Sequence, residues 1–258
     1  AVYSAFDAAQ IARDNPDKEV VFFSVGFETT VVAVAAMLKR GAPDNLSIIE
    51  ANYYTPPATH MLPELDGFDI EGFILPGHAV TITGLRVYEH LAEQGIACAS
   101  GGFEPVDVLA SIASLLEQLR DDKAIIDNPY SRLVKYDGNE KARSELHEVF
   151  ELGPIRWRGI AEIPESGYKL RPEYQKYSAA KKYAGRLDQR ALAGAEHPKG
   201  CRCAEVTLGQ IRPDECGVFG KLCTPDAPYG PCMVSHEGTC RAWYLYGMHK
   251  EKLNVEVA

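Results

Sequence analysis

The fold of this chain is decided by residues 19–41, which read EVVFFSVGFETTVVAVAAMLKRG. Glu19–Val25 is a largely apolar run, as is typical of a parallel strand buried on both faces. Gly26–Thr30 is a polar turn, and Val31–Arg40 has the pattern of a helix that Gly41 ends. Strand, turn and helix form the βα unit of a doubly wound sheet, which binds ligands at the carboxyl ends of its strands.

The same pattern recurs three times further along the chain. Strands are predicted at Leu46–Tyr53, Glu71–Leu75 and Gly95–Ser100, and each leads into a helical segment. The last of these segments is the amphipathic helix Asp107–Arg120. Alternating strands and helices predict an α/β fold in which residues 1–125 form a parallel, doubly wound (Rossmann-like) lobe.

Polar side chains follow the ends of these predicted strands. Glu28, Thr29 and Thr30 come after the first strand, His78 after the third and Glu104 after the fourth. Any one of them could simply cap a helix or lie in a loop. Because the carboxyl ends of parallel strands meet at one edge of a sheet, we expect the five side chains to share a cleft.

Two further regions follow this lobe. Residues 126–194 are predicted to connect the lobe to the C-terminal domain and to belong to an α/β lobe, with a helix at 141–150, a strand at 156–163 and a helix at 171–189. Residues 195–258 are predicted to form a smaller α+β cysteine-rich domain. Because residue 1 is Ala and the chain opens inside a helical pattern, we expect it to be a piece of a longer protein.

Six of the seven cysteines are crowded into this last region. They are Cys201, Cys203, Cys216, Cys223, Cys232 and Cys240. The seventh, Cys98, lies in an apolar strand and is expected to be a small buried core residue.

Disulfides, zinc and an iron–sulfur cluster could each explain the crowding. Disulfides suit small secreted domains, whereas zinc sites usually contain Cys-x-x-Cys pairs, which this sequence lacks. A cluster takes four thiolates and would leave two thiols for a switchable disulfide. Spacing alone indicates metal or redox chemistry and leaves the choice open.

The composition limits the classes of partner. A net charge of −9 argues against a general nucleic-acid binder, because phosphates require a basic surface. No apolar run approaches the roughly 20 residues that span a bilayer. We therefore expect neither nucleic acid nor a membrane as a partner.

Several motifs resemble those of the HypD family, which are maturation factors of [NiFe] hydrogenase. Residues 219–225, 230–235 and 237–240 are similar to the family's C-terminal cluster domain. VGFETT, LPGH and GFEPVD resemble the family motifs GFETT, PGH and GFEP in family order. The resemblance continues through residues 128–132, 137–139, 157–159 and 163–167, so it covers essentially the whole chain.

The resemblance implies roles for the cysteines and for the strand-end residues. A [4Fe-4S] cluster would be held by Cys201, Cys216, Cys223 and Cys240. Cys203 and Cys232 would remain as a redox pair, which the cluster reduces. The strand-end side chains named above would serve assembly of an Fe(CN)2(CO) unit or docking of a partner.

The resemblance also implies a cellular role. The protein would be an accessory maturation factor with redox activity rather than a conventional enzyme, a scaffold for the Fe(CN)2(CO) unit of the hydrogenase active site. Its partners would be the small chaperone HypC, the cyanide-donating HypE and, indirectly, the hydrogenase large subunit. A reducing cluster implies the cytoplasm, where thiols stay reduced.

One departure from the family concerns iron. HypD proteins carry an N-terminal lobe with Cys-Gly-[Thr/Gly]-His and Gly-Pro-Gly-Cys-Pro-Val-Cys elements, and neither element occurs here. The first of these thiols is thought to hold the iron together with HypC, so we expect a lobe to be missing from this chain. The alternatives are a cluster-dependent thiol–disulfide reductase and a zinc-stabilised protein-binding module.

Overall fold

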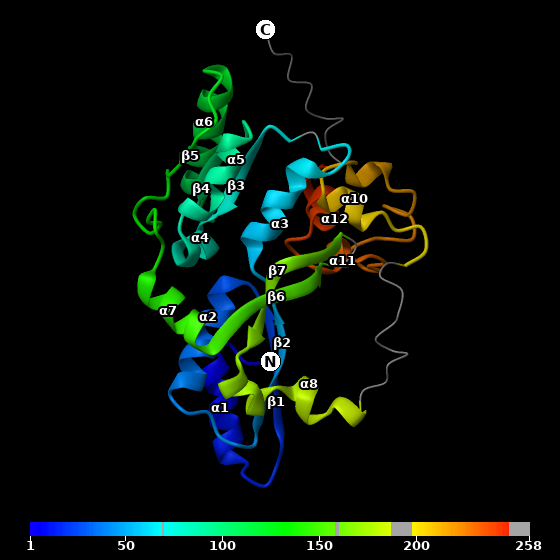
Figure 1. Cartoon of the computed structure of the whole chain (residues 1–258). Helices are drawn as coiled ribbons and strands as arrows, with labels where there is room; N and C mark the ends of the chain where they lie inside the picture. Colours follow the sequence, from blue (N-terminus) through cyan, green and yellow to red (C-terminus); the bar gives the residue numbers. More distant parts are fainter. Residues whose placement is uncertain (69, 158–159, 187–197, 248–258) are drawn as a thin grey trace. The chain divides into compact units, whose positions relative to one another are not determined.

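The structure, a computed structural model, describes residues 1–68, 70–157, 160–186 and 198–247 (Figure 1). Its contacts divide the chain into two compact units. The first comprises Ala1–Met61, Glu71–Ile155 and Glu162–Leu187. The second comprises Leu62–Ile70, Arg156–Ala161 and the described residues from 198 onward. Two short stretches between elements of the first unit therefore fold with the cysteine-rich region.

The first βα unit forms as predicted. Strand β1 (Val20–Gly26) leads into helix α2 (Glu28–Lys39) and pairs in parallel with β2 (Leu46–Asn52). Helix α1 (Ala5–Asp14) packs against β1 and α2, and α7 (Glu140–Val149) packs on α2. The parallel pairing confirms the α/β class for this part of the chain.

The core around this sheet is apolar. Helix α2 buries Val31, Val34 and Leu38, which recur at helical spacing on one face. These side chains meet buried alanines of α1 and the large side chains of α7 and of the strands that follow it, among them Phe150 and Leu170. Burial of this stripe, at roughly 1.5–3 kcal/mol for each large side chain, stabilises the layer.

A second sheet carries the later strand-end motifs. It has the order β3-β4-β5, with β3 (Gly72–Pro76), β4 (Ala97–Gly101) and β5 (Ile126–Asp127) all parallel. Helix α6 (Pro105–Arg120) packs on β4 and β3, and α5 (Glu89–Glu93) also contacts β4 (Figure 1). Helix α4 (Gly77–Thr83) follows β3 directly.

The four predicted strands are parallel, but they do not form the single sheet that the sequence predicted. The far side of β2 is occupied by a later segment, in which Ser178 forms an isolated parallel bridge with Ile48. Glu50 of β2 accepts hydrogen bonds from the backbone N–H of Leu170, at 3.1 Å, and from the hydroxyl of Ser178, at 2.7 Å. Since this segment takes the place where β3 would pair, β3 joins β4 in a sheet of its own.

The connection between the units differs from the prediction in its details. The residues of the predicted strand 156–163 end β6 (Phe150–Trp157) and begin β7 (Ala161–Leu170), which pair with each other. In place of one helix over 171–189, there is a 3-10 helix at Pro172–Tyr177 and a short α8 (Ala179–Lys182), followed by a 3-10 turn at Ala184–Arg186. Residues 158, 159 and 187–189, like the predicted domain boundary at 194/195, lie outside the described residues.

The cysteine-rich unit is built from short helices joined by turns. The helices are α10 (Cys203–Thr207), α11 (Pro231–Val234) and α12 (Thr239–Ala242), with a 3-10 turn at Pro213–Glu215 and a π-helical turn at Trp243–Gly247. Within residues 198–247 there is no strand, so the predicted β content of this domain is wrong for the part described. None of the described helices has the length and apolarity that a membrane span requires.

The short 62–70 stretch belongs to this second unit. It contains a 3-10 turn at Leu62–Glu64, and the side-chain amide of Gln210 donates a hydrogen bond of 2.8 Å to the carbonyl of Asp66. Helix α3 (Thr55–Met61) leads into this stretch, and β3 follows it. The chain therefore passes through the cysteine-rich unit between its two parallel sheets.

Candidate functional site

The strand-end residues separate into two groups, because they follow strands of different sheets. Glu28, Thr29 and Thr30 lie at the start of α2, after β1. His78 follows β3 and Glu104 follows β4, in the other sheet. The expectation of one shared sheet edge holds for the PGH and GFEP motifs, but GFETT lies at the end of another sheet.

Glu28 lies in a buried hydrogen-bond network. Its side chain is fully buried, and Oε1 accepts hydrogen bonds from the backbone N–H of Thr55, at 2.7 Å, and from the Thr55 hydroxyl, at 2.8 Å. The Thr55 hydroxyl is also 3.2 Å from that of Tyr88. Its carboxyl therefore holds the beginning of α3 against α2.

The charge state of Glu28 is shifted by this environment. Burial raises the pKa of its carboxyl, although the hydrogen bonds from Thr55 act in the opposite direction. The second oxygen, Oε2, is buried and has no hydrogen-bond partner among the described residues. A buried carboxylate oxygen without a hydrogen-bond donor destabilises the folded state. Protonation of the carboxyl would remove the negative charge and lower this cost.

Thr29 and Thr30 have a different setting from Glu28. The Thr29 side chain is exposed and that of Thr30 is partly buried. Both line a hollow of mixed polarity, with Tyr3, Ser4 and Phe23 among its walls. They therefore lie at the surface, whereas Glu28 is sealed inside.

His78 and Glu104 are exposed beside an ion pair. The ring of His78 lies edge-on to that of Phe103, with centroids 4.8 Å apart, and 6.3 Å from that of Tyr130. A carboxylate oxygen of Glu104 lies 3.9 Å from Arg132. Together these side chains form one polar and aromatic surface at the carboxyl ends of β3 and β4.

The anchor of this surface is Asp107, which the sequence had identified only as a helix residue. Asp107 is nearly buried and pairs with Arg132 through two hydrogen bonds, of 2.5 and 2.6 Å. The hydrogen bonds from Arg132 lower the pKa of the Asp107 carboxyl. The Arg132 guanidinium also lies 4.5 Å from the centroid of the Tyr130 ring. Asp107 and Arg132 both lie in segments that resemble family motifs, GFEPVD and 128–132. The sequence did not indicate that these two segments contact each other.

Close packing brings these strand ends together. A Cβ atom on Gly77 would collide with the carbonyl oxygen of Gly101 and with the ring of Tyr130. The second residue of the PGH motif therefore has to be glycine for α4 to begin so near to the end of β4.

The six C-terminal cysteines lie on separate short elements. Cys203, Cys232 and Cys240 belong to α10, α11 and α12, whereas Cys201, Cys216 and Cys223 lie between elements. Four of the six are buried, and Cys201 and Cys232 are partly exposed. Cys98 is buried in β4, as predicted for a core residue, and burial raises its pKa to about 12.

The sulfur atoms are close to one another. The Cys232 and Cys240 sulfurs are 2.9 Å apart, which is a hydrogen-bond contact rather than a disulfide bond of about 2.05 Å. Cys203 and Cys232 each shift the pKa of the other, so these two thiols are also near one another. The sulfur of Cys201 fills the space that a Cβ atom of Gly230 would need, so a glycine is required there.

The environment of these thiols favours their protonated form when no metal is bound. The neighbouring thiol of Cys232 raises the pKa of Cys203, and burial adds to the effect. Cys203 lowers the pKa of Cys232, but the contact with Cys240 and burial outweigh this and raise it to about 12. Burial also raises the pKa of Cys201, and the thiols of Cys216 and Cys223 are near enough to contribute. A metal would have to displace these protons.

The donor set fits an iron–sulfur cluster. Soft thiolates are the ligands that such clusters require, and four are present besides the pair Cys203 and Cys232. Cys223 and Cys240 pack with Val206 and Met233 in a small apolar core. Across the described ranges, no three His, Cys, Asp or Glu side chains are already gathered as ligands of a single metal ion.

Comparison with known proteins gives one consistent result. The HypD family model, described as "Hydrogenase formation hypA family", matches residues 1–247. The chain is 39% identical over 261 residues to hydrogenase maturation factor HypD2 of Bradyrhizobium diazoefficiens, an alignment that covers 97% of this chain and 67% of that relative. It is also 39% identical over 261 residues to hydrogenase maturation factor HypD of Cupriavidus necator, covering 97% of this chain and 68% of the relative.

The similarity extends to an archaeal sequence. The chain is 38% identical over 249 residues to a putative hydrogenase expression/formation protein of Methanocaldococcus jannaschii, covering 95% of this chain and 68% of that protein. The chain thus spans about two thirds of the length of these relatives.

Proposed function

Because the chain belongs to the HypD family of hydrogenase formation proteins, we propose that it serves the maturation of a [NiFe] hydrogenase. One observation carries the proposal: the family model matches residues 1–247, a span that includes the strand-end motifs and the cysteine-rich region. Maturation in this proposal means assembly of an Fe(CN)2(CO) unit on the protein as a scaffold, before its transfer to the hydrogenase large subunit.

The proposed cluster ligands are Cys201, Cys216, Cys223 and Cys240. The burial of three of these thiols and the proximity of Cys201 to Cys216 and Cys223 support this set. When bound, the [4Fe-4S] cluster would supply one-electron transfer.

Cys203 and Cys232 form the proposed redox pair. The closeness of the two thiols, each of which shifts the pKa of the other, supports the pairing, because a disulfide forms only between thiols that lie close together. Reduction of their disulfide would break the S–S bond and take up two protons and two electrons, which the cluster would pass on one at a time. Cys232 is also in contact with Cys240, so it lies between its proposed partner and a proposed ligand.

The strand-end groups have different proposed roles. Four of these side chains would contact the iron unit or a partner protein. Three are exposed, namely Thr29, His78 and Glu104, and Thr30 is partly buried. Glu28, although it belongs to the best-matched motif, is buried, so it would act by holding α3 in place. The proposed partners are HypC and HypE, and the proposed compartment is the cytoplasm, where thiols stay reduced.

Metal analysis of protein purified without oxygen tests the cluster. We expect a brown protein with four iron and four sulfide per chain, in keeping with the composition of a [4Fe-4S] cluster. Serine at Cys201, Cys216, Cys223 or Cys240 is expected to remove the colour and the iron. Serine at Cys203 or Cys232 is expected to retain both. A colourless protein that contains zinc would establish the zinc-stabilised alternative instead.

Hydrogenase maturation itself is measured in a host that lacks its own HypD and receives the protein that carries this chain. Substitution of the redox pair, Cys203→Ser with Cys232→Ser, is expected to abolish hydrogenase activity while the protein still binds its iron. Cys98→Ala is the matched control, because it also removes a thiol but lies in the other unit. Full activity without the redox pair would refute its role.

A further inference from the structure

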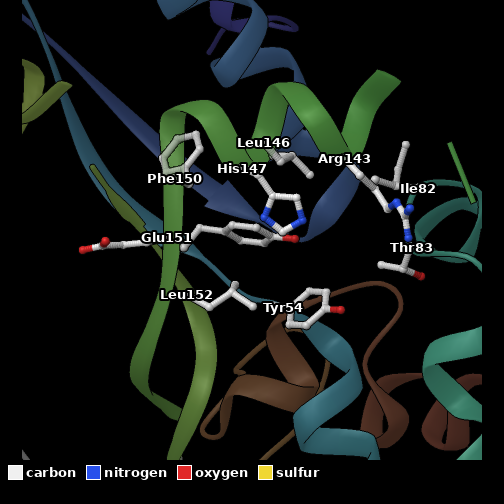
Figure 2. A pocket seen from close by; sticks show the side chains of 10 residues that line it. Tyr54, Ile82, Thr83, Arg143, Leu146, His147, Phe150, Glu151 and Leu152 are labelled. Atoms are coloured by element: carbon white, nitrogen blue, oxygen red, sulfur yellow. The ribbon is translucent and has the colours of Figure 1, made fainter. Parts of the chain in front are cut away.

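A small cavity in the first unit is lined by side chains from α4, α7, β6 and β7 and by Tyr54, which precedes α3 (Figure 2). Its volume is about 50 Å³. Ile82, Leu146, Phe150 and Leu152 make most of its wall apolar. A cavity of this size holds about three or four groups as large as a water molecule, since one such group needs about 10–15 Å³.

Three of the polar side chains that line this cavity have no hydrogen-bond partner among the described residues. Among the described residues, the guanidinium of Arg143 forms no hydrogen bond or ion pair, and its buried Nε is unsatisfied. The hydroxyls of Tyr54 and Tyr168 likewise have no hydrogen-bond partner in the described part of the chain. The two tyrosine rings are edge-on at 5.8 Å, so their hydroxyls belong to one small region. A buried N–H group is almost always hydrogen-bonded, so the unsatisfied Nε of Arg143, on a cavity that two unpaired tyrosine hydroxyls also line, points to a ligand.

The three groups share one chemical character, because each can donate a hydrogen bond. Arg143 carries a permanent positive charge and has donors only. Burial raises the pKa of Tyr54 to about 12, and burial likewise raises that of Tyr168, so both hydroxyls keep their protons at neutral pH. Arg143 is near enough to Tyr54 to oppose this rise.

The acidic residues nearby leave this character intact. Figure 2 shows the carboxylate of Glu151 directed away from Tyr54, Thr83 and Arg143. Glu28 raises the pKa of both tyrosines, but its carboxyl does not line the cavity, and burial favours its neutral form. The interior of the cavity is therefore a donor-rich, positively charged site with apolar walls.

We propose that this cavity binds a small monoanion of the carboxylate type, with about four heavy atoms. Two oxygens of such an anion would accept hydrogen bonds from Arg143 and from one or both tyrosine hydroxyls. Its carbon end would contact Leu146 and Leu152. The pairing of a planar carboxylate with a guanidinium is the strongest of the hydrogen-bonded arrangements available to these groups.

Acetate is the probe for this site, and the whole chain is the protein to use. We expect 13C-labelled acetate to show saturable binding by NMR, and we expect acetate to raise the melting temperature more than chloride at equal ionic strength. Arg143→Gln is expected to weaken binding by about tenfold or more, and Tyr54→Phe or Tyr168→Phe by roughly threefold to tenfold each.

Lys141→Gln is the matched control, because it removes one positive charge from the same helix but does not line the cavity. It is expected to leave acetate binding unchanged. If Arg143→Gln fails to fold, as judged by circular dichroism, the two tyrosine variants carry the test. Absence of saturable binding, or equal weakening by Lys141→Gln, would overturn the proposal and leave ordered water as the occupant.

Discussion

Glu28 illustrates how a single buried residue can serve the fold while it belongs to a functional motif. Its carboxyl is sealed from solvent and accepts two hydrogen bonds from Thr55, and its second oxygen has no partner within the described part of the chain. Burial favours the protonated carboxyl over the carboxylate. The stability of the protein should therefore depend on pH through this residue.

We predict that Glu28→Gln becomes more stable relative to wild type as pH rises. The measured quantity is the difference between the free energies of unfolding of the two proteins. The raised pKa means that the folded state binds more protons than the unfolded state, so wild type loses stability as pH rises above the ordinary value of 4.5. Glutamine resembles the protonated carboxyl and does not titrate. Below that pH, the two proteins should differ by no more than about 1 kcal/mol.

Urea unfolding at a series of pH values measures this difference. Glu117→Gln, which removes an exposed carboxylate of α6, is the matched control. A difference between wild type and Glu28→Gln that stays constant with pH would show that the carboxyl is not protonated on folding.

At the scale of elements, the start of α4 shows how a motif residue is fixed by packing. Strand β3 ends at Pro76, and the chain turns into α4 at Gly77 against the carbonyl of Gly101 at the end of β4. There is no room for a side chain, because the nearest atoms belong to the backbone and to the ring of Tyr130. This junction positions His78 on the surface that contains Phe103 and Arg132.

We predict that Gly77→Ala destabilises the protein by about 1–3 kcal/mol, because the added methyl group overpacks a site bounded by backbone. The measurement is the free energy of unfolding in urea. Gly185→Ala is the control, since a Cβ atom there would meet none of the described residues within 4 Å. Equal stability of the two variants would mean that α4 shifts without cost.

At the scale of the whole molecule, the two units differ in how they are stabilised. The first unit has an extensive apolar core around α2 and the strand-rich segments. The apolar core of the second is small and includes two of the proposed cluster ligands, Cys223 and Cys240. Small domains with little apolar burial usually depend on metals or disulfides.

We predict that a shortened chain ending at residue 194 keeps the helices of the first unit. Its far-ultraviolet circular dichroism should retain the helical signal, because the buried side chains of that unit all precede this residue. Its stability should fall, since the 62–70 stretch loses contacts such as the one from Gln210 to Asp66. A disordered spectrum would show that the first unit cannot fold without the cysteine-rich region.

Iron removal provides the complementary measurement on the intact chain. If the proposed cluster is bound, chelation of its iron should unfold the cysteine-rich unit and leave the first unit folded, so that the unfolding transition of the first unit remains. A single transition that moves as a whole on iron removal would contradict this independence.

The sequence by itself determined the local features of this protein. Strand and helix positions in residues 20–120 follow from apolar periodicity, and the parallel pairing follows from strand–helix alternation, because both depend on neighbouring residues. The crowding of the cysteines indicated metal or redox chemistry, and the motif resemblance extended this to a family.

The tertiary structure alone decided which of these local features meet. Residues 170–178, far along the chain, lie against the free edge of β2. The strands predicted to form one sheet therefore form two. Glu28 meets Thr55 across 27 residues, and Asp107 meets Arg132 across 25. The cavity of Tyr54, Arg143 and Tyr168 gave no local signal, because its donors come from segments that only packing brings together. Periodicity specifies which face of an element is buried, but not which distant segment covers it.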